Sequence, residues 1–220
     1  MLKKIIILVE GQTEERFAKT VLGPHLLTKD IYLAVTILNT KKVKDGSNFK
    51  GGIQNYEKVK SDLKNLFYDT SANLVTTMFD YYALPTDFPE FSSQSGTCYQ
   101  KVEHLEQAFA RDINKRKFLP YLQLHEFEAL LFSSTQIIVD TIPNSEGKID
   151  KLKEIREEFS SPEEINNSPE TCPSRRLKKL FPEYQKPVYG TLISSSIGLD
   201  VIRSECTHFN AWLVQLESVQ

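Results

Sequence analysis

The chain has few of the features that mark several common classes of protein. Its 220 residues contain three cysteines, which are widely spaced and form no C-x-x-C pair. This odd number argues against a zinc site or a disulfide framework and predicts reduced, mostly structural thiols. No stretch approaches the roughly 18 consecutive apolar residues of a membrane span, and the short apolar start lacks the length and cleavage site of a secretory signal. We therefore expect a cytoplasmic protein that does not enter a membrane.

The chain also lacks an excess of either charge and the glycine patterns of nucleotide-binding loops. Lys and Arg total 27 against 29 for Asp and Glu, so any site for a polyanion must be local. Neither G-x-G-x-x-G nor the Walker A pattern is present, and we expect any nucleotide hydrolysis to belong to a partner. The hydrophobic content of 40% is ordinary and suffices for one sizeable α/β domain, or for a compact domain with a smaller appendage.

The most informative segment is the junction between the first predicted strand and the first predicted helix. The apolar run Ile5 to Val9 has the composition of a strand covered on both faces, and it ends at Glu10. Gly11 then gives the chain freedom to turn. Thr13 is placed to cap the helix that follows, and the Glu14-Glu15 pair falls in its first turn, where the helix dipole favours negative charge.

Hydrophobic periodicity predicts an alternation of strands and helices along the rest of the chain. Further strands are expected at 31–38, 74–79 and 118–124, and helices at 13–27, 56–68, 98–111, 129–132, 150–159 and 175–180, with one or two more from 193 to the end. This order predicts an α/β fold with a mostly parallel sheet flanked by helices over residues 1–135, followed by a helical C-terminal extension over 136–220 that packs on the core.

Acidic residues stand at the ends of three predicted strands. Asp80 follows the third strand directly, and Glu126 and Glu128 come just after the fourth, so they repeat the placement of Glu10. The carboxyl ends of parallel strands share one edge of a sheet, so we expect these side chains to converge there. Clustered carboxylates repel one another and are usually held by a divalent cation, and hard oxygen ligands favour Mg²⁺ or Mn²⁺. The chemistry this implies is phosphoryl transfer, with Glu10 as the residue that shuttles a proton.

These segments resemble the Toprim superfamily of metal-dependent phosphoryl-transfer domains, which occur in topoisomerases, primases and nucleases. Residues 8–15 are similar to the first Toprim motif, a strand that ends in Glu-Gly and supplies the catalytic acid. Asp80 is similar to the first aspartate of the Asp-x-Asp motif, whereas Tyr82 stands where the second aspartate is expected. This departure puts two-metal catalysis in doubt. The resemblance implies that Glu128, or less surely Glu126, supplies the absent ligand.

More narrowly, segments at both ends and in the middle of the chain look like an uncharacterised Toprim-like bacterial family, the domain of unknown function 4276. The segments are 9–15, 77–82, 125–132, 197–203 and 208–213. This resemblance implies a toxic nuclease that works beside an ABC-type or overcoming-lysogenization-defect-like ATPase in anti-phage defence. It assigns catalysis to Glu10, Asp80 and Glu128, and metal binding to these three together with Glu126.

Other residues have two interpretations that the sequence leaves open. The candidates for phosphate binding are Gly11, Thr13, Arg175 and Arg176, although the basic run at 175–179 is also typical of a solvated helix face. Tyr81 and Tyr82 either stack on an unpaired base or pack beside their neighbours. His125 either contacts substrate or fills the interior. The lysine-rich connection at 41–52 either closes over a phosphate or is a surface loop.

The sequence thus predicts a Mg²⁺- or Mn²⁺-dependent nuclease that acts on DNA or RNA. The alternative is a non-catalytic, Toprim-shaped interaction or sensor subunit that docks an ATPase through its apolar C-terminal helices. A weaker third possibility is a phosphatase that acts on small substrates. No base-reading pattern distinguishes DNA from RNA, and the oligomeric state and activating trigger stay open.

Overall fold

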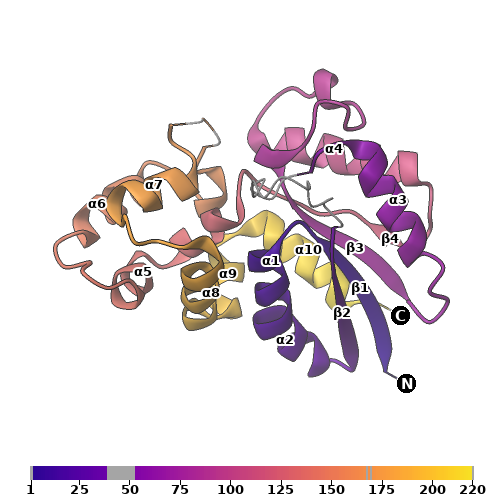
Figure 1. Ribbon diagram of the computed structural model, residues 1–220, viewed down its shortest axis with the longest axis horizontal. Helices are drawn as coiled ribbons and strands as arrows, with labels where there is room; N and C mark the ends of the chain where they lie inside the picture. Colours follow the sequence, from indigo (N-terminus) through magenta and orange to yellow (C-terminus); the bar gives the residue numbers. More distant parts are fainter. Residues whose placement is uncertain (1, 39–52, 167, 169, 220) are drawn as a thin grey trace, which may run out of the picture.

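The computed structural model describes residues 2–38, 53–166, 168 and 170–219. Within them a five-stranded sheet lies between two layers of helices, and a lobe of short helices extends to one side (Figure 1). The predicted α/β class with a mostly parallel sheet and a helical C-terminal stretch is confirmed. The lysine-rich connection predicted at 41–52 lies outside the described residues.

The sheet brings the ends of two acid-bearing strands to the same place. Its strands are β1 (Lys3–Val9), β2 (Ile31–Ile37), β3 (Leu74–Asp80), β4 (Phe118–Leu119) and β5 (Leu122–Gln123). The order is β2-β1-β3-β4, β5 also pairs with β3, and these pairings are parallel. Val9 is in register with Met78, so Glu10 and Asp80 leave neighbouring strands at one edge.

The predicted fourth strand is interrupted, which corrects the continuous strand expected at 118–124. Pro120 separates β4 from β5 because proline has no N–H to contribute to a ladder. The side chain of Thr77 replaces part of the lost pairing. Its hydroxyl donates to the carbonyl of Tyr121 at 3.1 Å and accepts from the N–H of Tyr121 at 3.0 Å.

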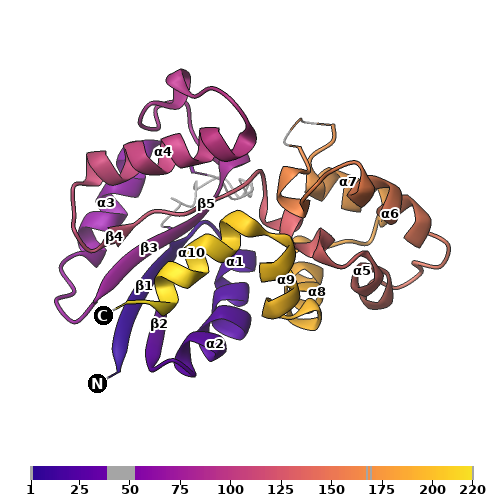
Figure 2. The same cartoon turned by 180° about the vertical axis from the view of Figure 1, so that it is seen from behind.

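Side chains of β1 alternate between two hydrophobic clusters on the two faces of the sheet. Ile5, Ile7 and Val9 belong to one cluster, and Ile6 and Leu8 belong to the other. The first face is covered by α1 (Gln12–Phe17), the π-helical turn η1 (Ala18–Leu22), α2 (Gly23–Leu27) and α10 (Thr207–Glu217). The second face is covered by α3 (Tyr56–Leu66) and α4 (Cys98–Ile113), and Figure 2 shows α10 on the face opposite them.

The helix predicted at 13–27 exists as the continuous series α1, η1 and α2, but its predicted cap is wrong. Gly11 occupies the N-cap position of α1 without any side-chain hydrogen bond. Thr13 is instead the second residue of α1 and is buried. The acidic first turn is present as expected.

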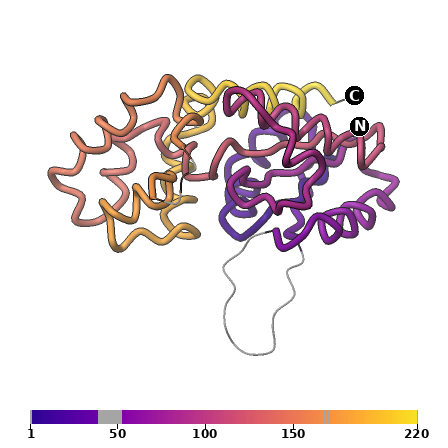
Figure 3. The backbone as a smooth tube through the Cα atoms, turned by 90° about the horizontal axis from the view of Figure 1, so that it is seen from above, coloured from indigo at the N-terminus to yellow at the C-terminus, as the bar shows by residue number. Residues whose placement is uncertain are grey.

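The second half of the chain forms the side lobe and then returns to the sheet, as the tube in Figure 3 shows. Its elements are the 3-10 helix η4 (Phe127–Ser133), α5 (Thr135–Thr141), α6 (Ile149–Glu157), the 3-10 turn η5 (Pro162–Glu164), α7 (Pro173–Leu180), the π-helical turn η6 (Lys186–Gly190), α8 (Thr191–Ile197) and α9 (Leu199–Glu205). Three helices, rather than one or two, occupy the C-terminal stretch. Gly198, with a φ of 79°, breaks the chain between α8 and α9.

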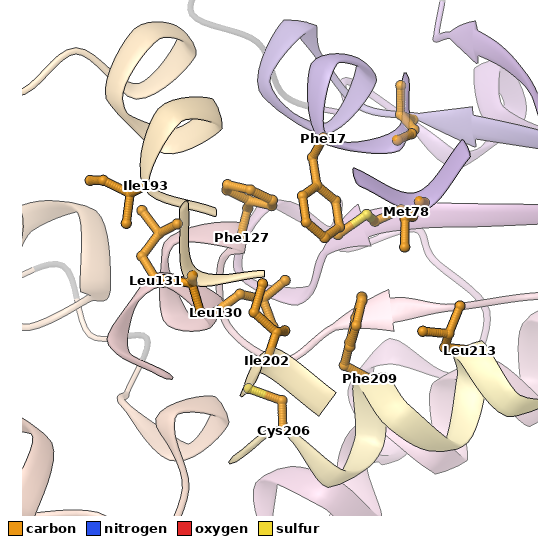
Figure 4. Close-up of a cluster of buried hydrophobic side chains, with 14 of the residues drawn as sticks. Phe17, Met78, Phe127, Leu130, Leu131, Ile193, Ile202, Cys206, Phe209 and Leu213 are labelled. Carbon is orange, nitrogen blue, oxygen red and sulfur yellow. The ribbon is translucent and has the colours of Figure 1, made fainter. Parts of the chain in front are cut away.

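One hydrophobic cluster joins the lobe to the sheet across the predicted division at residue 135. Phe17 and Phe127 from the first region contact each other with ring centroids 5.3 Å apart. Ile193, Ile202 and Phe209 from the second region belong to the same cluster (Figure 4). The two regions therefore share a core.

The sequence predicts a chain without a membrane span and with reduced thiols. Among the helices of the described residues, none combines the length and apolar character that crossing a membrane requires. The three cysteines are free, and Cys172 and Cys206 are buried.

Packing of α10 on the sheet predicts a large stability cost for truncating a buried side chain of this helix. Phe209 is fully buried, so Phe209→Ala should lower the free energy of unfolding by about 3–5 kcal/mol in urea titrations. Val214, on the same helix, is 47% exposed, and Val214→Ala should change it by less than about 0.5 kcal/mol. Equal, small effects would show that α10 is not part of the core.

Candidate functional site

A pocket of about 370 Å³ lies at the carboxyl ends of β1 and β3. Its lining includes the four acids singled out in the sequence, which are Glu10, Asp80, Glu126 and Glu128. The structure thus brings together residues separated by more than a hundred positions in the chain. They meet because a parallel sheet directs the carboxyl ends of its strands to one edge. Each of these acids lies at a strand end or in the segment that follows one.

Glu10 and Asp80 are linked directly through the backbone. The N–H of Asp80 donates to Oε2 of Glu10 at 3.3 Å. Asp80 is itself held from the other side, because the N–H of Phe127 donates to its Oδ1 at 2.8 Å. Asp80 is 5% exposed and Glu10 is partly buried. The Asp80 carboxylate is therefore fixed in orientation before any ligand arrives.

Glu126 and Glu128 both line the pocket because the backbone changes conformation between them. Glu126 is extended, with φ of −145° and ψ of 155°, and Glu128 lies in the first turn of η4. Glu126 is already engaged, since the N–H and the hydroxyl of Ser174 donate to its two oxygens at 2.9 and 3.0 Å. Glu128 is fully buried, and neither of its oxygens accepts a hydrogen bond from the described residues.

A lysine that the sequence patterns did not single out lies among these acids. The ammonium nitrogen of Lys186 is 3.1 Å from Oε2 of Glu128, 3.2 Å from Oδ2 of Asp80 and 3.4 Å from Oε1 of Glu14. The ammonium of Lys186 is thus the counter-charge nearest to the buried Glu128 carboxylate in the described structure. The Lys186 side chain is 32% exposed, whereas the three carboxylates are nearly or fully buried.

Burial and mutual repulsion change the protonation of the cluster. Burial, then the negative charge of Glu14, raises the pKa of Glu10 from 4.5 to about 7, although Lys186 opposes this. Burial also raises the pKa of Asp80 and of Glu128 above their usual values, against the attraction of Lys186. For Lys186, burial alone would lower the pKa, but the charges of Asp80 and Glu128 outweigh burial and raise it well above its usual value. The ammonium therefore stays charged at neutral pH.

The basic residues of α7 divide into two groups. Arg175 and Lys178 line the pocket and are exposed, and within the described part of the chain their side chains have no hydrogen-bond or ion-pair partner. Arg176 is committed elsewhere, because its Nε donates to the carbonyl of Thr171 at 2.7 Å and its Nη1 is 3.6 Å from Glu158. Of the two arginines proposed for phosphate binding, only Arg175 is at the pocket.

Gly11 and Thr13 do not line the pocket, although both were candidates for phosphate binding. The methyl group of Thr13 instead lies close to η6. A Cβ added to Gly190 would lie 3.1 Å from the methyl carbon of Thr13 and 3.4 Å from the ring of Phe127. A glycine at position 190 thus lets the turn that carries Lys186 approach α1 closely.

Of the two tyrosines and the histidine singled out in the sequence, one lines the pocket and two do not. Tyr82 lines the pocket and is 42% exposed, whereas Tyr81 donates its hydroxyl to Gln94 and packs against the hydrophobic cluster of the second sheet face. His125 is buried with a φ of 59° and does not line the pocket. Burial, with a contribution from Lys101, lowers its pKa to about 4, so it is neutral at physiological pH.

The donor chemistry of the pocket fits a hard divalent cation. Among the described residues no group of three or more His, Cys, Asp or Glu is already arranged around a common metal position. The ammonium of Lys186 instead contacts both acids, at 3.2 Å from Asp80 and 3.1 Å from Glu128. Carboxylate oxygens are the ligands that Mg²⁺ and Mn²⁺ prefer, and Glu128 offers oxygens without other hydrogen bonds.

Residues 9–217 match a family described as Domain of unknown function (DUF4276). The matched range includes the residues that line the pocket, from both the sheet region and the lobe. No curated protein and no solved structure matches the chain.

The raised pKa of Glu10 predicts a specific pH dependence of stability. A carboxyl whose pKa is higher in the folded state stabilises the fold fully below pH 4.5, and this contribution is lost as the pH rises through about 7. Between pH 5 and 8, the Tm of the wild type should therefore fall relative to that of Glu10→Gln. We expect a relative fall of at least about 3 °C, the shift that roughly 1 kcal/mol produces in a chain of this size. If the Tm values of the two proteins changed with pH in the same way, the pKa assigned to Glu10 would be contradicted.

Proposed function

For this chain, which belongs to the DUF4276 family, we propose the function of a divalent-metal-dependent nuclease that hydrolyses phosphodiester bonds. The observation that carries the proposal is the convergence of Glu10, Asp80 and Glu128 on one pocket whose wall also carries Arg175 and Lys178. Acids alone would repel a phosphate, and cations alone would not hold a divalent ion. Together they match a substrate that is negatively charged and a cofactor that is positively charged.

Asp80 and Glu128, with Glu10 beside them, are the residues that would hold Mg²⁺ or Mn²⁺. Glu126 is the weaker candidate because Ser174 already uses both of its oxygens. When bound, the cation would polarise the scissile phosphate and favour ionisation of a nearby water.

The chain's own residues supply proton transfer and orientation. Burial raises the pKa of Glu10 to about 7 in the metal-free protein, and a bound cation would lower it, so beside the metal Glu10 would be ionised and able to accept a proton as a general base. The bond from Phe127 N–H keeps the Asp80 carboxylate in one orientation. Arg175 and Lys178 attract and align the phosphate through their uncommitted charges.

The wider setting of this proposal rests on resemblance. The motif segments resemble Toprim domains, which supports a phosphoryl-transfer role for the strand-end acids. The same resemblance supports an ABC-type or overcoming-lysogenization-defect-like ATPase partner and a role as the toxic effector of anti-phage defence. Restraint of such an activity would then require the partner. A cytoplasmic location is proposed because the sequence holds no apolar run long enough to span a membrane.

A non-catalytic interaction subunit is the second candidate, and one observation favours it. Lys186 already balances part of the negative charge of Glu14, Asp80 and Glu128, so the buried carboxylates do not require a metal ion for stability. A docking module would keep this ion-pair cluster and bind no cation through it.

Calorimetric titration with Mn²⁺ separates the two candidates. The wild type should bind Mn²⁺, and Asp80→Asn or Glu128→Gln should each weaken binding at least about tenfold because each removes a charged ligand. Asp150→Asn, which changes an exposed acid of α6, is the control and should bind as the wild type does. If the wild type does not bind Mn²⁺, or if neither pocket substitution weakens its binding, the interaction subunit is the better account.

The place of Lys186 predicts competition between its ammonium and the cation. Lys186→Met should destabilise the metal-free protein by about 2 kcal/mol, less than the 3–5 kcal/mol typical of a fully buried pair because the lysine is partly exposed. The same variant should bind Mn²⁺ about tenfold more tightly, since the carboxylates lose their internal counter-charge. Lys178→Met is the matched control for stability. Unchanged Mn²⁺ affinity in Lys186→Met would show that the lysine and the cation do not share these carboxylates.

A further inference from the structure

We propose that the pocket takes a nucleic-acid strand with unpaired bases, with one base stacked on Tyr82 and the adjoining phosphates held by Arg175 and Lys178. This inference rests on the proposed nuclease function and adds to it the class of substrate. It depends on residues that the carboxylate cluster does not use.

Tyr82 is held at the pocket by the backbone rather than by its ring. It lies two residues after Asp80 in the 3-10 turn η2 (Tyr81–Ala83), and its N–H donates to the carbonyl of His125 at 2.9 Å. Tyr82 as a residue remains 42% exposed although it lines a pocket of buried acids. An aromatic ring in this position cannot hold a hard cation, but it offers a face on which any base can stack.

Arg175 and Lys178 are available to an anion. They are three residues apart on α7, so their side chains lie on neighbouring parts of one helix surface. Both are exposed and line the pocket, and no side-chain partner is seen for either among the described residues. Arg176, between them, shows the contrast because its guanidinium is bound to the protein itself. These two positively charged side chains at the pocket therefore favour contact with a phosphate backbone.

A base that stacks on Tyr82 must be unpaired. Inside a duplex each base has both faces covered by its neighbours and its edge bonded to its partner, so it has no face to offer the tyrosine ring. The pocket, of about 370 Å³, lies within the roughly 300–1,000 Å³ range of ligand pockets. The stacking site, rather than the pocket volume, therefore favours a strand with unpaired bases.

Fluorescence anisotropy with labelled oligonucleotides tests this inference without requiring cleavage. The full chain is titrated into a 12-nucleotide single-stranded DNA, the same sequence as RNA, and the corresponding DNA duplex, first in EDTA and then with Ca²⁺. We expect at least one single strand to bind about tenfold more tightly than the duplex. Tyr82→Ala should weaken that binding about tenfold, and Tyr82→Trp should restore it, because stacking requires an aromatic face.

The basic residues have a separate readout. Arg175→Ala and Lys178→Ala should each weaken binding and lower the salt dependence of log K by roughly 0.7, the single-strand value for one phosphate contact. Lys179→Ala and Tyr68→Ala are the controls, since Lys179 lies on α7 outside the pocket and Tyr68 is an exposed tyrosine away from it. Both controls should bind as the wild type does.

Three results would overturn the inference: no binding of either single strand, equal binding of the duplex, or full displacement of the strand by a mononucleotide at similar concentration. The last would indicate a small phosphorylated substrate. Each leaves the Mn²⁺ titration of Asp80→Asn and Glu128→Gln unaffected, so failure of the substrate assignment is distinguishable from failure of the metal site.

Discussion

The ion pairing of the Lys186 ammonium with the buried carboxylates of Glu14, Asp80 and Glu128 is the interaction on which the site depends. A parallel sheet places its strand ends at one edge, and here that edge carries several acids. Buried negative charges require a positive charge nearby, or they take up protons. Lys186 supplies this charge in the structure, and a divalent cation would supply it in the proposed enzyme. The same electrostatic requirement explains why a lysine lies among the buried acids, and it is the reason we propose that a divalent cation can take its place.

The site is assembled from both regions of the chain. The sheet region supplies Glu10 and Asp80, and η4 adds Glu128, whereas α7 and η6 of the lobe supply the cations that line the pocket. The shared hydrophobic cluster in Figure 4 holds these parts in place. Residues 1–135 alone would therefore carry the carboxylates without their counter-charge. The helical region is a structural partner of the acidic edge and supplies part of the pocket wall.

The sequence predicted those parts of the fold that depend on local pattern. Apolar runs ending in acids located β1 and β3, and parallel topology then implied that Glu10 and Asp80 meet. Lys186 could not be found in this way, because it lies 106 residues from Asp80 in a proline-containing segment without periodicity. Glu14 carried a usable signal, since it stands three residues before buried Phe17 on the inward face of α1. Arg175 and Arg176 look alike in sequence, and only tertiary packing decides which one reaches the pocket.

Anomalous diffraction from crystals of the full chain grown with Mn²⁺ tests the central claim most directly. The account predicts an anomalous peak within about 2.0–2.3 Å of oxygens of Asp80 and Glu128, with the Lys186 ammonium moved away from both carboxylates. A pocket without such a peak at millimolar Mn²⁺, in which Lys186 keeps its contacts with both acids, would contradict it.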